Sequence, residues 1–242
     1  MIKKILILTT SALCCIVVVG GGVWCSTQYD SSLCNEVIVV VEDGVNHQFV
    51  GAEELIYFLD AKQYYPQGDS MRSVNCHAIE QCLEQHDMVR VAECYKSPLG
   101  KVHIKVQQRV PVLAVVTNDG CYYVDSDRKV MPIRGEMDES IFVVRGAVSK
   151  RAATEEYYDF VAWLGESNYW CKRIRTIHVH NPKYLVLTQD GMPAKIILGE
   201  LSGYEKKLGN LRNLYTKGLD KMGYPDYREY DLRYAKQVIG RK

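Results

Sequence analysis

The chain has 242 residues, of which 47% are hydrophobic and 24% charged, and its formal net charge at pH 7 is +1. This balance excludes the basic excess that is typical of nucleic-acid-binding proteins, so no nucleic acid is expected as a partner. The length is enough for a membrane segment followed by one large or two small folded domains.

The first notable segment is an uncharged apolar run over residues 5–25, which contains no proline and no amide side chain. A helix of this length rises about 30 Å, the hydrocarbon thickness of a bilayer. Lys3 and Lys4 precede the run, and the next basic residue is Lys62; this asymmetry favours a cytoplasmic N-terminus. We therefore expect a cytoplasmic tail over 1–4, a transmembrane helix over 5–25, and a periplasmic remainder.

Two alternatives remain open for the apolar run, a cleaved signal peptide and a lipidated cysteine. Signal peptides usually have an apolar region of ~7–15 residues that ends at small residues. Here the run ends at Trp24 and Cys25, and the bulk of Trp24 disfavours both cleavage and lipidation beside it. An uncleaved single-pass anchor in the inner membrane is the favoured prediction.

The next segments predict a small mixed domain over 35–109. A β-branched strand is followed by two amphipathic helices, the second with Asn75 as a plausible N-cap, and then by two strands of alternating polarity joined by a Pro-Gly turn. The predicted ranges are 37–43, 51–59, a helix from 75, 88–95 and 102–107. The order β-α-α-β-β indicates a sheet with both helices on one face.

Residues 110–242 predict a second, mostly antiparallel β domain with flanking helices, which gives an α+β fold overall. Strands are expected over 112–117, 121–125, 141–146, 173–180, 184–189 and 194–199. Helices are expected to start at Thr154 and at Ser202, the latter with Glu205 completing a capping box, and Gly218 and Gly223-Tyr224-Pro225 should stop the second helix. A long final strand is expected over 227–240, with Tyr230, Leu232, Tyr234 and Val238 on one face.

Six cysteines follow the apolar run, and no two of them form a C-x-x-C motif, so no zinc or thioredoxin-like site is predicted. Disulfides are permitted outside the cytosol, but several of these residues lie on apolar faces, which favours free buried thiols. The pairing stays open. The residues are Cys34, Cys76, Cys82, Cys94, Cys121 and Cys171.

No hydrolase, zinc-protease or phosphate-binding motif is present, so we predict no catalytic residue and no cofactor. His178 and His180 share a strand face, but no third ligand is placed to complete a metal site. The pair Asp125 and Asp127 lacks the later ligands of a calcium loop and predicts an Asp-rich turn instead.

Several stretches together resemble the FtsQ/DivIB family of bacterial cell-division proteins. The anchor followed at once by the β-α-α-β-β module is similar to the family's POTRA domain, and 83–111 to its hairpin and junction. DGCYYVDSDRKVMPI (119–133) resembles the opening of its β domain, and YDLRYAKQVIGRK its terminal strand. Two departures are Gln108, where the family usually has Glu, and Arg128-Lys129, where it usually has Gly.

This resemblance implies a non-enzymatic divisome protein at the septum. It would bind membrane-bound partners of FtsB and FtsL type outside the cytoplasm by strand addition, with septal peptidoglycan synthases as further partners, and help control septal peptidoglycan synthesis. Arg233 and Tyr234 match the family's binding motif. The prediction extends along the strand to Tyr230, Leu232, Lys236, Gln237, Val238 and Ile239.

Alternatives stay open at both the residue and the protein level. Leu232 and Val238 are equally suited to filling the core, and Asp231 to a structural role. The whole chain is also compatible with an anchored POTRA-type chaperone or transport accessory, or with a Cys-dependent envelope enzyme.

Overall fold

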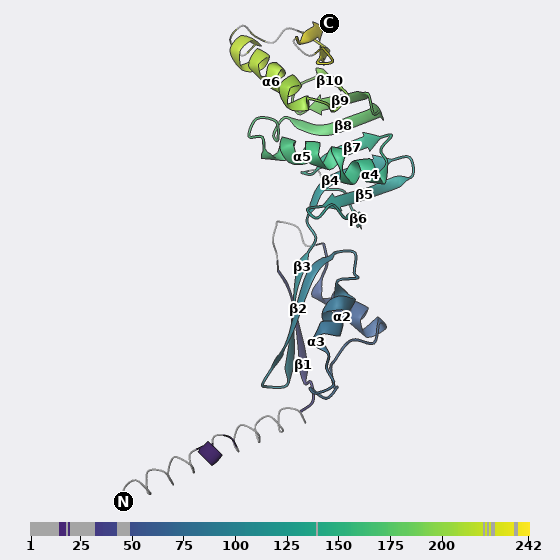
Figure 1. The fold of residues 1–242 in the computed structure, drawn as a ribbon. Coiled ribbons are helices and arrows are strands. Elements are labelled where there is room, and N and C mark those ends of the chain that lie inside the picture. Colours follow the sequence, from purple (N-terminus) through teal and green to yellow (C-terminus); the bar gives the residue numbers. More distant parts are fainter. Residues whose placement is uncertain are drawn as a thin grey trace, which may run out of the picture. The chain divides into compact units, whose positions relative to one another are not determined.

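The computed structural model describes residues 15–17, 19, 32–42, 49–138, 140–219, 221, 223, 226–234 and 237–242. It divides into two compact units, Met1–Arg109 and Val110–Lys242 (Figure 1). The predicted tail and membrane segment lie outside the described residues, apart from 15–17 and 19. Among the helices that are described, none combines the length and the apolar character needed to cross a membrane.

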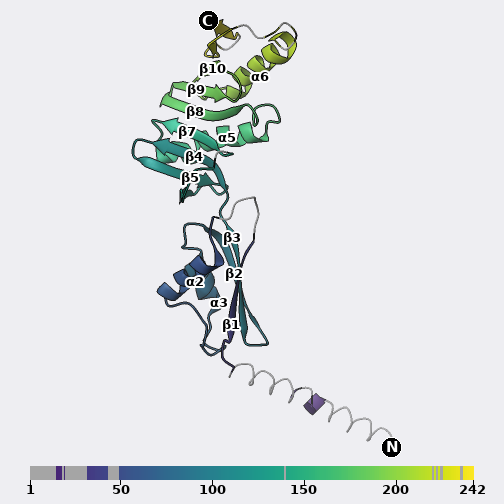
Figure 2. The ribbon, with the colours of Figure 1, turned by 180° about the vertical axis from the view of Figure 1, so that it is seen from behind.

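The first unit has the predicted order β-α-α-β-β. It consists of β1 (Glu36–Glu42), α2 (Ala52–Ala61), α3 (Cys76–Leu83), β2 (Val89–Ser97) and β3 (Lys101–Gln108). Strand β3 lies in the middle of the sheet, antiparallel to β2 and parallel to β1. Both helices cover one face of this sheet (Figures 1 and 2). The β2–β3 hairpin is confirmed, as is the Asn75 cap, whose side chain accepts the Ala78 N–H at 3.1 Å.

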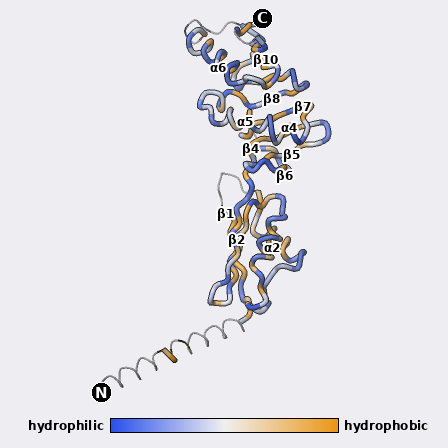
Figure 3. Tube along the Cα trace, in the orientation of Figure 1, coloured by the Kyte–Doolittle hydropathy of each residue, from blue (hydrophilic) through white to orange (hydrophobic). Residues whose placement is uncertain are grey.

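The core of the first unit forms where alternate strand residues meet the apolar stripes of the helices. Leu55 and Leu59 of α2 and Ile79 of α3 are buried, as are Val102 and Ile104 of β3. The alternation of polarity along β2 and β3 is visible in Figure 3, where the loops between elements are mostly hydrophilic. This alternation sets the register, because a shift by one residue would expose the apolar set.

The second unit is built on one mixed sheet, in which the described strands number nine. They are β4 (Pro111–Thr117), β5 (Gly120–Asp125), β6 (Val130–Pro132), β7 (Phe142–Gly146), β8 (Ile174–Asn181), β9 (Tyr184–Gln189), β10 (Lys195–Gly199), β11 (Glu229–Asp231) and β12 (Ile239–Arg241). Their spatial order is β12-β11-β10-β9-β8-β7-β4-β5-β6. The pairs β4–β7, β7–β8 and β10–β11 are parallel, and the others are antiparallel.

Helical crossovers account for two of the parallel pairs, because a parallel neighbour cannot be reached through a tight turn. The chain passes from β7 to β8 through α4 (Lys150–Thr154) and α5 (Glu156–Glu166). It passes from β10 towards β11 through α6 (Tyr204–Leu214) and a π-helical turn, η1 (Tyr215–Leu219). Both crossovers lie on the same side of the sheet. The centres of the Tyr204 ring on α6 and the Phe160 ring on α5 are 4.9 Å apart.

The core of the second unit lies between these helices and the sheet. It joins Phe160 and Leu164 of α5, Leu208 and Leu211 of α6, and inward residues of the strands from β4 to β11. Trp170 is the largest fully buried side chain. The core extends to Tyr230, so the sheet is anchored to its helices almost as far as the C-terminal edge.

Three predicted helix boundaries are wrong. Ser149, not Thr154, accepts an N–H at a helix start, and the Thr154 hydroxyl bonds back to Lys150 and Arg151 carbonyls at the end of α4. The Ser202 hydroxyl bonds to Glu200 instead of capping α6, whose N-cap is Gly203 with φ +64°. Gly218 does not end the helix, since η1 runs through it. The hydroxyl groups of Thr154 and Ser202 thus bond to neighbouring groups other than the N–H groups at a helix start.

The predicted long strand over 227–240 is also wrong. This stretch forms two short antiparallel strands, β11 and β12, with Tyr230 opposite Gly240. Tyr230 and Leu232 are buried, whereas Tyr234 is 49% exposed, so the expected shared face of the strand is not formed. Apolar residues continue at every second position as far as Tyr234, beyond the end of β11, and periodicity alone does not show where a strand ends.

Candidate functional site

The C-terminal edge of the second unit is organised around Asp231, whose side chain is fully buried at the end of β11. Its Oδ1 accepts bonds from the Arg233 backbone N–H at 3.1 Å and from Arg233 Nε at 3.0 Å. Its Oδ2 accepts from Arg233 Nη2 at 2.7 Å and from Arg241 Nη2 at 3.0 Å. One carboxylate thus connects β11, the following turn and β12.

These contacts change the proton affinities of both partners. The bonds from the Arg233 side chain, assisted by the charge of Arg241, lower the pKa of the Asp231 carboxyl, although burial acts in the opposite direction. The same bond raises the pKa of the Arg233 guanidinium. A buried carboxylate needs such compensation, because an unpaired charge away from water is very costly.

Arg233 reaches the surface across the end of β10. A Cβ added at Gly199, which has φ +77°, would lie 2.8 Å from the Arg233 Cγ. The guanidinium carbon lies 5.8 Å from the centre of the Tyr184 ring, within the range of a cation–π contact. The missing side chain at Gly199 therefore leaves room for the aliphatic part of Arg233. Asp231 and Tyr184 fix the position of its guanidinium group.

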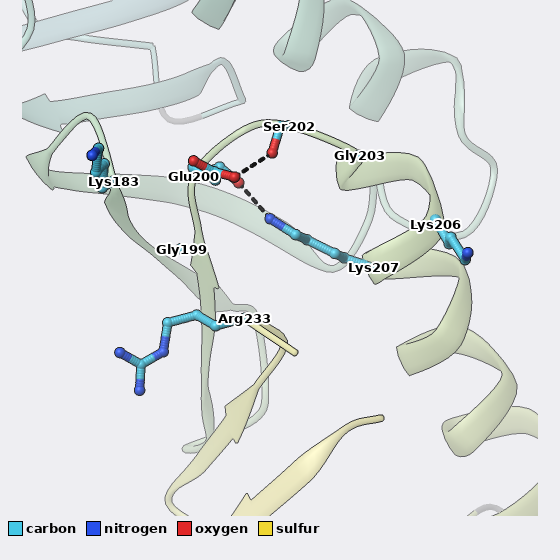
Figure 4. A pocket seen from close by; sticks show the side chains of 8 residues that line it. All are labelled: Lys183, Gly199, Glu200, Ser202, Gly203, Lys206, Lys207 and Arg233. Carbon is cyan, nitrogen blue, oxygen red and sulfur yellow. Dashed lines mark hydrogen bonds between the residues drawn. The ribbon is translucent and has the colours of Figure 1, made fainter. Parts of the chain in front are cut away.

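Beside Arg233 is an open pocket of about 390 Å³, between the start of α6 and the β10 end (Figure 4). Its cationic side chains are Lys183, Lys206, Lys207 and Arg233, against one carboxylate, Glu200. Lys207 Nζ donates to the Glu200 carbonyl at 2.7 Å and to the Leu198 carbonyl at 3.3 Å, and burial lowers its pKa. The net charge of the lining is positive, which suits an acidic group on a partner.

Strand β12 forms the outer edge of the sheet. It pairs with β11 on one side, and the described residues include no strand on its other side. The ring of Tyr227 covers Gly240, since a Cβ there would lie 2.7 Å from the Tyr227 Cε2. An edge of this kind offers main-chain N–H and C=O groups to an added strand.

The predicted partner-binding residues separate into three groups. Tyr230 and Leu232 are buried in the core: the Tyr230 ring packs against Tyr215, and the Leu232 N–H donates to the Ile197 carbonyl. The more accessible positions are Arg233, Tyr234 and Gln237, with Val238 and Ile239 half-buried. Lys236 lies outside the described residues.

Other candidate chemistry receives little support from the geometry. Burial raises the pKa of the Cys34 and Cys82 thiols, which opposes formation of a nucleophilic thiolate. Burial and the nearby Arg145 lower the pKa of His178. Within the described part of the chain, no three His, Cys, Asp or Glu side chains gather as metal ligands would.

Asp125, predicted to belong to an Asp-rich turn, has a structural role. Asp125 Oδ1 accepts the N–H groups of Asp127 at 2.9 Å and Lys129 at 2.7 Å, and Arg128 takes φ +62° between them. This confirms the predicted Asp-rich turn, and it explains why a turn forms at this position without the family's usual Gly.

Sequence reasoning missed three contributors to the C-terminal site. Arg241 lies ten residues from Asp231 and meets it only because the chain folds back. Tyr184 and Lys207 come from β9 and α6, and their places depend on the sheet order. Gly199 carried a usable signal, since a Gly at the end of an apolar strand often marks a bulge or a close backbone approach.

Comparison with known families defines the class of protein first. A family model described as POTRA-like domain matches residues 32–107, so the first unit carries a module of that class ahead of a sheet-rich body. A second model, described as FtsQ/DivIB, C-terminal related, matches residues 110–241, more than half of the chain. A search of curated proteins found no significant match.

The chain belongs to the FtsQ/DivIB family. This family consists of non-enzymatic cell-division proteins, and membership implies partners within a division complex. The predicted resemblance is therefore confirmed for both regions of the chain.

Proposed function

We propose that this protein is a membrane-anchored, non-enzymatic component of the divisome. It binds coiled-coil partners of FtsB and FtsL type outside the cytoplasm and helps control septal peptidoglycan synthesis. Family membership supports the division role. The apolar run over 5–25, with Lys3 and Lys4 before it, supports a single inner-membrane anchor with the POTRA-like and β domains in the periplasm.

The observation that carries the binding mode is the outer edge of β12. A partner segment adds to this edge as a further strand, with Tyr234 and Gln237 offering side-chain contacts beside it. The positive pocket next to Arg233 favours acidic residues on the partner.

Proline substitution in β12 tests this binding mode. Neighbouring residues in a strand direct their N–H groups to opposite sides, so only one of Ile239 and Gly240 directs its N–H away from β11. Ile239→Pro and Gly240→Pro should therefore differ. The variant that loses the outward N–H should remain folded and bind the co-produced FtsB/FtsL-type partners about tenfold more weakly.

The control for this pair is Gly240→Ala, which places a Cβ beside the Tyr227 ring without removing an N–H. Binding is measured by titration of the purified partner complex, and folding by thermal unfolding. Wild-type affinity in both proline variants, each folded, would rule out strand addition at β12.

Depletion in cells distinguishes the division role from a transport role. Loss of the protein should give filaments with blocked septa and a fluorescent fusion should gather at midcell. A transport accessory would leave septation normal.

A further inference from the structure

Two cysteines of the first unit face each other where α3 packs on β2. Cys76 is the first residue of α3, and Cys94 lies on the inner face of β2, buried between the outward residues Glu93 and Tyr95. The side chain of Cys76 lies close enough to that of Cys94 to raise the pKa of the Cys94 thiol. A disulfide bond between them requires the two sulfur atoms to approach to about 2.05 Å.

A second contact fixes the same geometry independently. The backbone N–H of Cys94 donates to Glu80 Oε1 at 2.8 Å. Glu80 lies one helical turn after Cys76, so both residues share one face of α3. That face is therefore held against the main chain of β2 at Cys94, which keeps the Cys76 thiol beside its partner.

We propose that Cys76 and Cys94 form a disulfide bond that ties α3 to β2. The oxidant is a protein disulfide of the dithiol-oxidase class, which acts by thiol–disulfide exchange. The two thiols lose two protons and two electrons, one S–S bond forms between them, and the oxidant's disulfide is reduced to two thiols. The proposal needs the extracytoplasmic location for this oxidant, but it does not depend on partner binding.

The exposure of the two thiols indicates which one reacts first with the oxidant. Cys76 is half-buried, whereas Cys94 is buried. Burial raises the pKa of Cys94, and Cys76 and Glu80 raise it further. Cys76 is thus the thiol that attacks the oxidant, giving a mixed disulfide, and Cys94 then displaces the oxidant from Cys76.

The remaining described cysteines of both units provide controls. Cys34 is buried with its thiol donating to the Glu36 carbonyl at 3.7 Å, and Cys82 is buried on α3. Cys121 is exposed and Cys171 half-buried. All of these differ from the proposed pair, because among the described cysteines only Cys94 has its pKa raised by another cysteine, Cys76.

The test is peptide mapping of the purified full-length chain. Reduced protein is incubated with oxidised glutathione, free thiols are alkylated, and a non-reducing digest is analysed by mass spectrometry. A peptide pair linked through Cys76 and Cys94 is expected, and it should persist in Cys121→Ser and Cys171→Ser. The oxidised chain should also unfold roughly 5–15 °C higher in its first unit.

The variants separate the two steps. Cys94→Ser should trap glutathione on Cys76, whereas Cys76→Ser should leave Cys94 unmodified. If alkylation finds both thiols free in oxidised wild-type protein, or if either is linked to another cysteine, the proposal is overturned without recourse to a variant. Failure of partner binding in the β12 variants would leave this result unchanged.

Discussion

Strand β12 is only three residues long, and Asp231 supplies much of what holds it to the sheet. Its carboxylate is shared between Arg233, next to the turn, and Arg241, in β12 itself. The side chains of the two arginines are 39% and 47% exposed, while that of Asp231 is fully buried. Arg233, which resembles a residue of the family's binding motif, is therefore also a structural residue of this edge.

Asp231→Asn should weaken the second unit. The substitution removes the charge that both guanidinium groups bind, and hydrogen bonds to charged groups contribute about 1.5–3 kcal/mol each. We expect the free energy of unfolding to fall by about 2 kcal/mol, measured by urea denaturation. Asp190→Asn is the matched control, because Asp190 and Arg175 form a surface pair at 3.4 Å that should contribute less than about 1 kcal/mol. Equal losses in the two variants would contradict the structural role.

The same carboxylate predicts a pH dependence. An aspartate in the unfolded chain titrates near 3.8, and the native pKa of Asp231 is lower. Its contribution to stability is therefore complete above about pH 4 and is lost as the pH falls through the native pKa. The difference in unfolding free energy between the wild type and Asp231→Asn should shrink as the pH is lowered below 4. A constant difference would show that the charge is not responsible.

At the scale of elements, the end of β10 determines where Arg233 lies. Gly199 has φ +77° at a register shift between β9 and β10, and the Arg233 stem passes over it. Gly199→Ala should cost about 1–3 kcal/mol for the backbone conformation and should also displace Arg233. Gly191→Ala is the control, because Gly191 has φ +72° with nothing within 4 Å of an added Cβ.

Partner affinity separates the two effects of the Gly199 substitution. Both variants should lose similar stability from the backbone, but only Gly199→Ala should weaken binding of the FtsB/FtsL-type partners. Titration with purified partners under conditions where both variants are folded provides the measurement. Equal affinities would show that the Arg233 position does not matter for binding.

The elements that sequence reasoning placed well are those with a clean periodicity. In β3, Val102, Ile104 and Val106 alternate with polar residues, and all three are buried. The C-terminal stretch also has an apolar residue at every second position from Tyr230 to Tyr234, so its pattern continues past the end of β11 at Asp231. The ion pair that turns the chain there joins residues that no local pattern relates. The predicted single long strand is therefore two short strands in the structure, and its role in partner binding stays a prediction.

At the scale of the whole molecule, each unit has its own buried core, and polarity patterns indicated both sheets and most helices. The sheet order was not predicted. The neighbours of β7 are β4 and β8, both parallel to it, and parallel pairing depends on crossovers whose packing is tertiary. Tyr184, Gly199 and Arg233 come together only through that order, which explains why the surroundings of the site could not be derived from the sequence.

The proposed anchor gives a prediction for the entire protein. A tether raises the local concentration of the periplasmic domains beside membrane-bound partners, often to the millimolar range. A fragment of residues 26–242, exported without its anchor, should still bind partners in a pull-down but should fail to restore division after depletion. The same fragment fused to an unrelated single-pass anchor should restore it. Full complementation by the untethered fragment would show that the tether is dispensable.

The order of strands in the second sheet also matters during synthesis. From β4 onward, the strands β7 to β12 add to one growing edge in the order in which they leave the ribosome. Domains generally fold as the chain emerges from its N-terminal side, so each nascent edge is covered by the strand translated next. The edge at β12 is completed last. A truncated or stalled chain therefore displays a different edge, and under the proposed binding mode a partner that adds to β12 would join only molecules in which β12 has been made.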